Sequence, residues 1–157
     1  FLTTGIKESV AAVYKQQLEV HKFRLSNSEK VFQFKLDASQ TLCRLYHNIL
    51  PEQTHPDQEF DEVIPHIADC FDQHEAELVD FLCEYQATLS NDVLHKIRTA
   101  ISACSDGKFG FYWTDDKTGG PTCTPEAGEM ATVLVKTIRE ATESLRKEVH
   151  EMITVTK

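Results

Sequence analysis

One Gly and no Pro occur in TTGIKESVAAVYKQQLEVHKFRLSNSEKVFQFKLDASQTLCRLYHNIL, residues 3–50. Apolar residues recur in this stretch at steps of three, four and seven, which is the spacing of one face of a helix. The face consists of Ile6, Val10, Val13, Val20, Val31, Phe34, Ala38, Leu45 and Ile49, with polar Gln17, Arg24 and Asn27 among them. The pattern predicts a long helix over residues 1–50, roughly 70 Å in length at about 1.5 Å per residue.

Three further helices are predicted, over residues 57–89, 91–105 and 125–154. Acidic residues crowd the first turns of the 57–89 helix, where the helix dipole favours negative charge. Pro65 lies inside that pattern and predicts a kink. Ser90 is a helix N-cap residue, and Thr124-Pro125 has the composition of an N-cap followed by a first helical position.

The segment 106–124 interrupts the helices with aromatic residues followed by a Gly-rich turn. It predicts a small hairpin or an aromatic-anchored loop. The fold class is therefore all-α: a four-helix, bundle-like single domain over residues 1–157, with one long N-terminal helix and an insertion before the last helix.

Composition excludes several classes of protein. Apolar residues make up 41% and charged residues 26% of 157 residues, which is typical of a folded domain and not of a disordered chain. The net charge of −9 argues against a nucleic-acid-binding protein. The stretch 49–89 holds eleven acidic residues and no Lys or Arg. We expect a solvated face there, partly complemented by the first helix, or a surface for a cation or a basic partner.

The cysteines favour a cytoplasmic location. A position at the cytoplasmic face of a membrane is an alternative. Five cysteines occur without a C-x-x-C pair, which is typical of buried, reduced thiols in a reducing compartment. Cys123 is expected to react first with a thiol reagent. The chain begins Phe1-Leu2 and contains no run of 18 apolar residues. We expect contact with a membrane only through a segment upstream of residue 1.

One metal-site hypothesis follows from spacing. His66, Cys70 and His74 stand four residues apart on one predicted helix, so their side chains lie on neighbouring turns and could converge on one transition-metal ion. Against this, eight residues turn a helix by about 80°. His74 also falls on the apolar stripe, where a core histidine is more common.

Two surfaces are candidates for binding a protein partner. The first is the start of the long helix, represented by Ile6, Val10, Val13 and Tyr14. The second is the aromatic group Phe111, Tyr112 and Trp113. Neither surface brings a recognised catalytic or nucleotide-binding motif, so enzymatic activity is not expected, and no cofactor is expected either.

The sequence therefore favours a non-enzymatic helical interaction or assembly domain, such as the cytoplasmic part of a membrane-anchored bacterial protein. The alternatives are a metal-binding helical bundle and a small effector or toxin that acts through the 106–124 loop. Helices of about 30 residues leave some 15–17 residues at the start of the long helix uncovered. Because they carry an apolar stripe, we expect a homo-oligomer formed through this helix.

Overall fold

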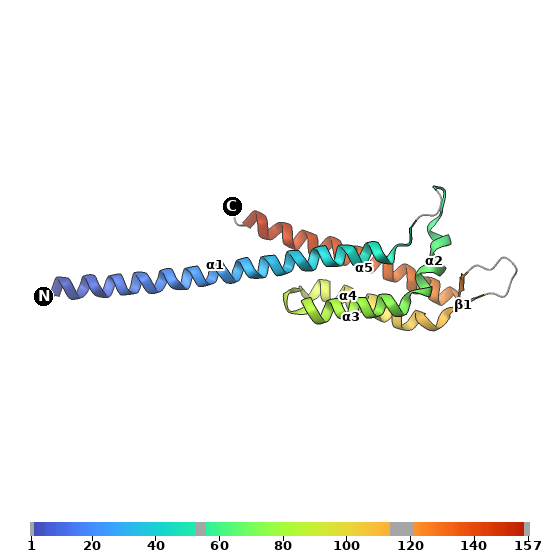
Figure 1. The fold of residues 1–157 in the computed structure, drawn as a ribbon, viewed down its shortest axis with the longest axis horizontal. Helices are drawn as coiled ribbons and strands as arrows, with labels where there is room; N and C mark the ends of the chain where they lie inside the picture. The colour runs from blue at the N-terminus through green and yellow to red at the C-terminus, as the bar shows by residue number, and fades with distance from the viewer. Residues whose placement is uncertain (1, 53–55, 114–120, 156–157) are drawn as a thin grey trace. The chain divides into compact units, whose positions relative to one another are not determined.

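The computed structural model describes residues 2–52, 56–113 and 121–155 and confirms an all-α helical fold (Figure 1). Its α-helices are α1 (Leu2–Ile49), α2 (Phe60–Asp69), α3 (Phe71–Tyr85), α4 (Asn91–Gly107) and α5 (Pro125–Val155). Short elements η1 (Gln86–Thr88), η2 (Lys108–Gly110), β1 (Phe111–Trp113) and β2 (Pro121–Cys123) connect them. The described residues thus contain five α-helices, one more than predicted.

The chain divides into two compact units, and α1 contributes to both. Unit 1 is Phe1–Phe34 and unit 2 is Lys35–Lys157. Within its described residues, unit 1 consists of the first part of α1 alone. Unit 2 contains the last part of α1 and all the other elements.

The hydrophobic core lies in unit 2, where α4 packs against both α3 and α5 (Figure 1). The largest fully buried side chains are Phe71, Leu42, Ile67, Leu78, Ile97, Leu134, Ile138 and Leu145. From α1, Ala38, Leu42 and Ile49 are buried in this core, and Leu45 packs against it. Leu42 is the residue that the predicted stripe omitted, because the spacing changes after Ala38.

A polar contact accompanies this packing between α1 and α3. The Tyr85 hydroxyl donates a hydrogen bond to the Asp37 carboxylate, and Tyr85 itself is buried. This hydrogen bond, with burial as a smaller cause, raises the pKa of Tyr85 above its ordinary value. The phenol therefore stays protonated and remains a donor at neutral pH.

The predicted helix 57–89 is in fact two helices joined at Cys70. Pro65, where a kink was predicted, lies inside α2, and the helix breaks five residues later, at Cys70 (φ −101, ψ 12). The Cys70 N–H bonds to the Ile67 carbonyl, which tightens the last turn of α2. Figure 1 shows α2 running across the direction of α3. Because the junction is one residue long, the four-three spacing of apolar residues continues through it and does not reveal it.

Both predicted N-caps are present. The Ser90 hydroxyl accepts a hydrogen bond from Val93 N–H at 3.3 Å, and the Thr124 hydroxyl accepts one from Ala127 N–H at 3.2 Å. Each satisfies a backbone donor that the first turn of its helix leaves without an intrahelical partner. The sequence therefore located the starts of α4 and α5 correctly.

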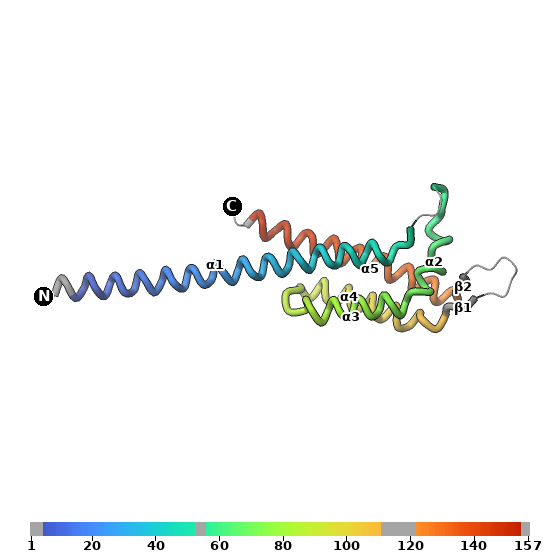
Figure 2. Tube along the Cα trace, viewed as in Figure 1, coloured from blue at the N-terminus to red at the C-terminus, as the bar shows by residue number. Residues whose placement is uncertain are grey.

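The 106–124 segment contains the hairpin that was one of its two predicted forms. β1 and β2 are antiparallel, with Tyr112 opposite Thr122, between α4 and α5 (Figure 2). At its base, Thr124 N–H bonds to the Gly110 carbonyl at 2.8 Å. A Cβ at Gly110 would lie 2.5 Å from Thr124 Oγ1, so this close approach requires glycine. Residues 114–120 lie outside the described part.

Candidate functional site

The apolar face of unit 1 is exposed along its whole described length. We call this face the α1 seam; it comprises Ile6 (60% exposed), Val10 (63%), Val13 (52%), Val20 (45%), Val31 (48%) and Phe34 (38%). Every described side chain from Gly5 to Val31 is exposed, a longer stretch than the 15–17 residues expected. An exposed apolar face of this length marks an interaction surface more often than a solvated one.

The spacing of the α1 seam is that of a coiled coil. In heptad notation Val10 and Val31 are a positions, whereas Ile6, Val13 and Val20 are d positions. The pattern runs through Phe34, also a d position. It therefore presents nearly four heptads to a neighbouring helix.

Three polar residues interrupt the α1 seam, at Gln17, Arg24 and Asn27. All three are exposed. Polar residues at a and d positions lower the stability of a coiled coil but restrict its register and its partners. The seam therefore has the composition of a selective binding surface and not of a permanently buried core.

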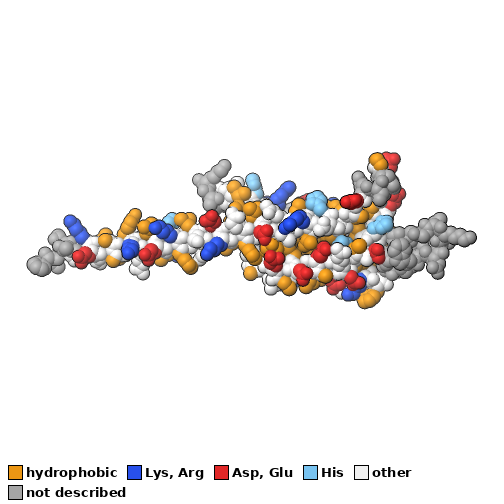
Figure 3. All heavy atoms as spheres, viewed as in Figure 1, with side chains coloured by type: hydrophobic (Ala, Val, Ile, Leu, Met, Phe, Trp, Pro, Cys, Tyr) orange, Lys and Arg blue, Asp and Glu red, His pale blue; other side chains and the backbone are white. Residues whose placement is uncertain are grey.

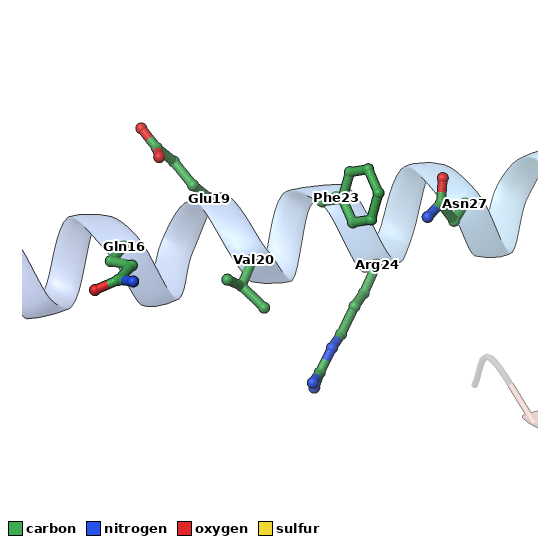
Figure 4. A pocket seen from close by; sticks show the side chains of 6 residues that line it. All are labelled: Gln16, Glu19, Val20, Phe23, Arg24 and Asn27. Atoms are coloured by element: carbon green, nitrogen blue, oxygen red, sulfur yellow. The ribbon is translucent and has the colours of Figure 1, made fainter.

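Shallow depressions lie along this face and are formed by α1 alone. One is lined by Gln16, Glu19, Val20, Phe23, Arg24 and Asn27 (Figure 4). A second, overlapping one is lined by Val13, Gln16, Gln17, Val20, His21 and Arg24. Because every wall comes from one helix, these are spaces between neighbouring side chains of α1, open to a facing helix.

Apolar side chains also lie off the α1 seam. Tyr14, a predicted partner-binding residue, is 67% exposed, and Leu18 is 41% exposed on the side of the helix away from Val20. Figure 3 shows hydrophobic and basic side chains intermingled along this part of α1. Leu18 therefore provides a comparison residue of similar exposure outside the seam.

The other predicted partner surface is only partly described. Phe111, Tyr112 and Trp113 form β1, but their side chains lie outside the described residues. Phe109, two residues before Phe111, is 87% exposed, and Lys108 Nζ lies 5.5 Å from the centre of its ring. This cation–π contact orients Lys108 beside an exposed ring.

The three residues of the metal hypothesis lie in different surroundings. His66 is exposed on α2, Cys70 is the junction residue, and His74 is 4% exposed in α3. Among the residues that the structure describes, no three His, Cys, Asp or Glu side chains are arranged so that they could hold a metal ion. His74 thus lies in the core, as its place on the apolar stripe predicted.

Burial shifts the pKa values of His74 and Cys70. Burial lowers the pKa of His74, although Glu77 acts in the opposite direction, and the His74 Nδ1 atom is buried without a hydrogen-bond partner. Burial, with Asp69 and Glu77 as smaller causes, raises the pKa of the Cys70 thiol. A neutral imidazole and a protonated thiol are therefore the favoured forms at neutral pH.

Part of the acidic stretch is neutralised by a cation that follows α4. Lys108 Nζ lies 3.3 Å from Glu75 Oε2 and 3.8 Å from Asp72 Oδ1. The side chain of Asp72 remains 83% exposed. Asp72 is thus solvated, and the cation beside it comes from η2 and not from the first helix, which the sequence predicted to complement the acidic stretch.

In comparisons with known proteins, no family model, curated protein or solved structure matches this chain. None of the helices in the described ranges combines the length and the apolar composition that crossing a bilayer requires.

Proposed function

We propose that this protein is a non-enzymatic helical interaction domain that assembles with another helix through the α1 seam. The observation that carries the proposal is the exposure of that seam, 38–63% at its six apolar positions. In water such a face costs free energy, which a facing helix recovers by burying it.

The architecture of unit 1 supports the same function. Within its described residues it contains no second element on which α1 could pack. Most of the stability of a helix in a protein comes from packing of its apolar face. A second helix, from another copy of the chain or from a different protein, would supply that packing.

The cysteines support a cytoplasmic setting for this assembly. All five are free thiols, and Cys104 is buried. Free thiols persist in reducing compartments, where disulfides are rare. An interaction domain that acts in the cytoplasm needs no disulfide to hold its core together.

Site-specific photo-crosslinking in the native host tests the proposal. A photoreactive residue at Val20 should form a covalent adduct with a protein, and the same residue at Leu18 should not. The two positions are a matched pair, because their side chains are 45% and 41% exposed on different sides of one helix. Equal yields at both positions, or no adduct at either, would contradict the proposal.

A further inference from the structure

Three of the five Lys and Arg residues of unit 1 lie on or beside the α1 seam, and the other two, Lys15 and Lys22, lie at outer f positions. Arg24 is an a position of the seam, Lys7 directly follows Ile6, and Lys30 directly precedes Val31. The residue after a d position and the residue before an a position border a coiled-coil interface on its two sides. All three cations are exposed and thus accessible to a facing helix.

None of the carboxylates of unit 1 lies on the α1 seam or at the positions that border it. Glu8 and Glu29 fall at heptad position f, on the outer side of the helix. Glu19 falls at position c, outside the bordering positions, although it lines the same depression as Val20. Figure 4 shows Glu19 pointing to the opposite side of α1 from Val20 and Arg24. From residue 5 to residue 34, the seam and its bordering positions therefore contain cations and neutral residues but no carboxylate.

This distribution disfavours pairing of the α1 seam with the same seam of a second copy. Whichever direction or register two such helices adopt, only cationic and neutral residues face each other across the interface. Arg24 would meet no carboxylate there, and the bordering lysines would gain no ion pair. Like charges at these positions act against an association.

A lipid surface is also a poor match, although basic amphipathic helices bind anionic membranes. Gln17, Arg24 and Asn27 lie in the middle of the apolar face. Inserting that face among acyl chains would strip water from three polar groups without providing hydrogen-bond partners. Side chains of a facing helix can provide them.

From this charge arrangement we infer that the occupant of the α1 seam is an amphipathic helix of a different protein, with acidic residues on both sides of its apolar seam. The inference rests on the proposed function and specifies the chemistry of the partner. Carboxylates at the bordering positions of that helix pair with Lys7 and Lys30, and one carboxylate near its seam pairs with Arg24.

Two synthetic probe helices test the inference against the full chain. They share apolar residues at every a and d position and differ only at e and g, which are Glu in one probe and Lys in the other. At low ionic strength the Glu probe should bind roughly tenfold more tightly than the Lys probe, as measured by fluorescence anisotropy. The preference should shrink as salt is added.

Matched charge reversals on α1 provide the control. Lys7→Glu with Lys30→Glu should abolish the preference for the Glu probe. Lys15→Glu with Lys22→Glu changes the net charge by the same amount at outer f positions and should retain the preference. Because all four side chains are exposed, none of these changes removes core packing.

Several outcomes would overturn the inference. These are equal affinity for the two probes, equal effects of the two double variants, self-association of the unaltered chain that Val20→Asp abolishes, and binding to phosphatidylserine vesicles without binding to either probe. A different result would contradict the proposed function, namely equal yields of photo-crosslinking at Val20 and Leu18.

Discussion

Lys35 Nζ lies 2.9 Å from Glu148 Oε2, so an ion pair joins α1 to α5 where the packed part of α1 begins. The two side chains are only 15% and 22% exposed. Replacing Lys35 with Met leaves the buried Glu148 carboxylate without its counter-charge. We expect the free energy of unfolding in urea to fall by about 1–2 kcal/mol.

A double-mutant cycle identifies the cause of that loss. Lys35→Met combined with Glu148→Gln should cost less than the sum of the two single changes, because each single change already breaks the same pair. Strictly additive losses would show that the ion pair does not contribute to the stability of unit 2.

Gly107 lies where α3, α4 and α5 approach one another. A Cβ at this position would lie 2.5 Å from Phe71 Cε2 and 2.9 Å from Met130 Cβ. Gly107→Ala should therefore destabilise the protein by about 1–3 kcal/mol through overpacking, as measured by chemical denaturation.

Gly128 in α5 provides the matched control, because a Cβ there would meet Ile64 at an ordinary 3.5 Å. Gly128→Ala should stabilise the protein by roughly 0.5–1 kcal/mol through its higher helix propensity. A stabilising Gly107→Ala would refute the packing described at the crossing of these helices.

The buried His74 predicts how stability depends on pH. Because its pKa is lowered in the folded state, the unfolded chain binds the proton first as the pH falls below the ordinary histidine value of about 6.5. The free energy of unfolding should decrease from that pH downward and level off below the folded-state pKa. His74→Leu should reduce this decrease, whereas His66→Gln, at an exposed position, should not. An unchanged pH profile in His74→Leu would contradict the assignment.

The cysteines should differ widely in reactivity. Cys83 is exposed and Cys104 is buried, and burial, with Glu75 as a smaller cause, raises the pKa of Cys104 to about 12. The thiolate is the reactive form, so a thiol reagent at pH 8 should label Cys83 first and Cys104 last. Mass spectrometry of labelled peptides distinguishes them, and Cys83→Ser should remove the fastest phase.

The exposure of the thiols disagrees with the expectation that Cys123 reacts first, because Cys83 is exposed and Cys123 is not. Its side chain is partly buried, and burial raises its pKa. Labelling of Cys123 ahead of Cys83 would contradict the exposure of these two thiols.

Local signals in the sequence determined much of the fold. Ser90 and Thr124 lie at real helix starts because an N-cap depends on the residues of a single turn. The break at Cys70 could not be predicted, since one junction residue leaves the apolar spacing intact. Leu42 was missed for a related reason. A heptad pattern alternates steps of four and three, but Phe34, Ala38 and Leu42 follow each other in two successive steps of four, so Leu42 falls outside the heptad positions that Phe34 and Ala38 define.

The sequence predicted the apolar face of the candidate site but not how far along α1 that face is exposed. The spacing of Ile6, Val10 and Val13 predicted an apolar face, but the same spacing continues to Ala38, which is buried. Periodicity identifies a face without showing whether another element covers it. The segregation of Lys7 and Lys30 from Glu19 depends on heptad position, and heptad notation applied to the sequence would have revealed it.

The most direct test of the central claim is the affinity of the tighter-binding probe helix for two variants of the full chain, Val20→Asp and Leu18→Asp. Both replace a similarly exposed apolar residue of α1 with the same charged residue, so their effects on helix propensity are comparable. If the α1 seam is the binding surface, Val20→Asp weakens binding at least about tenfold and Leu18→Asp leaves it nearly unchanged. Equal affinity of the two variants would show that the α1 seam is not where this protein binds its partner.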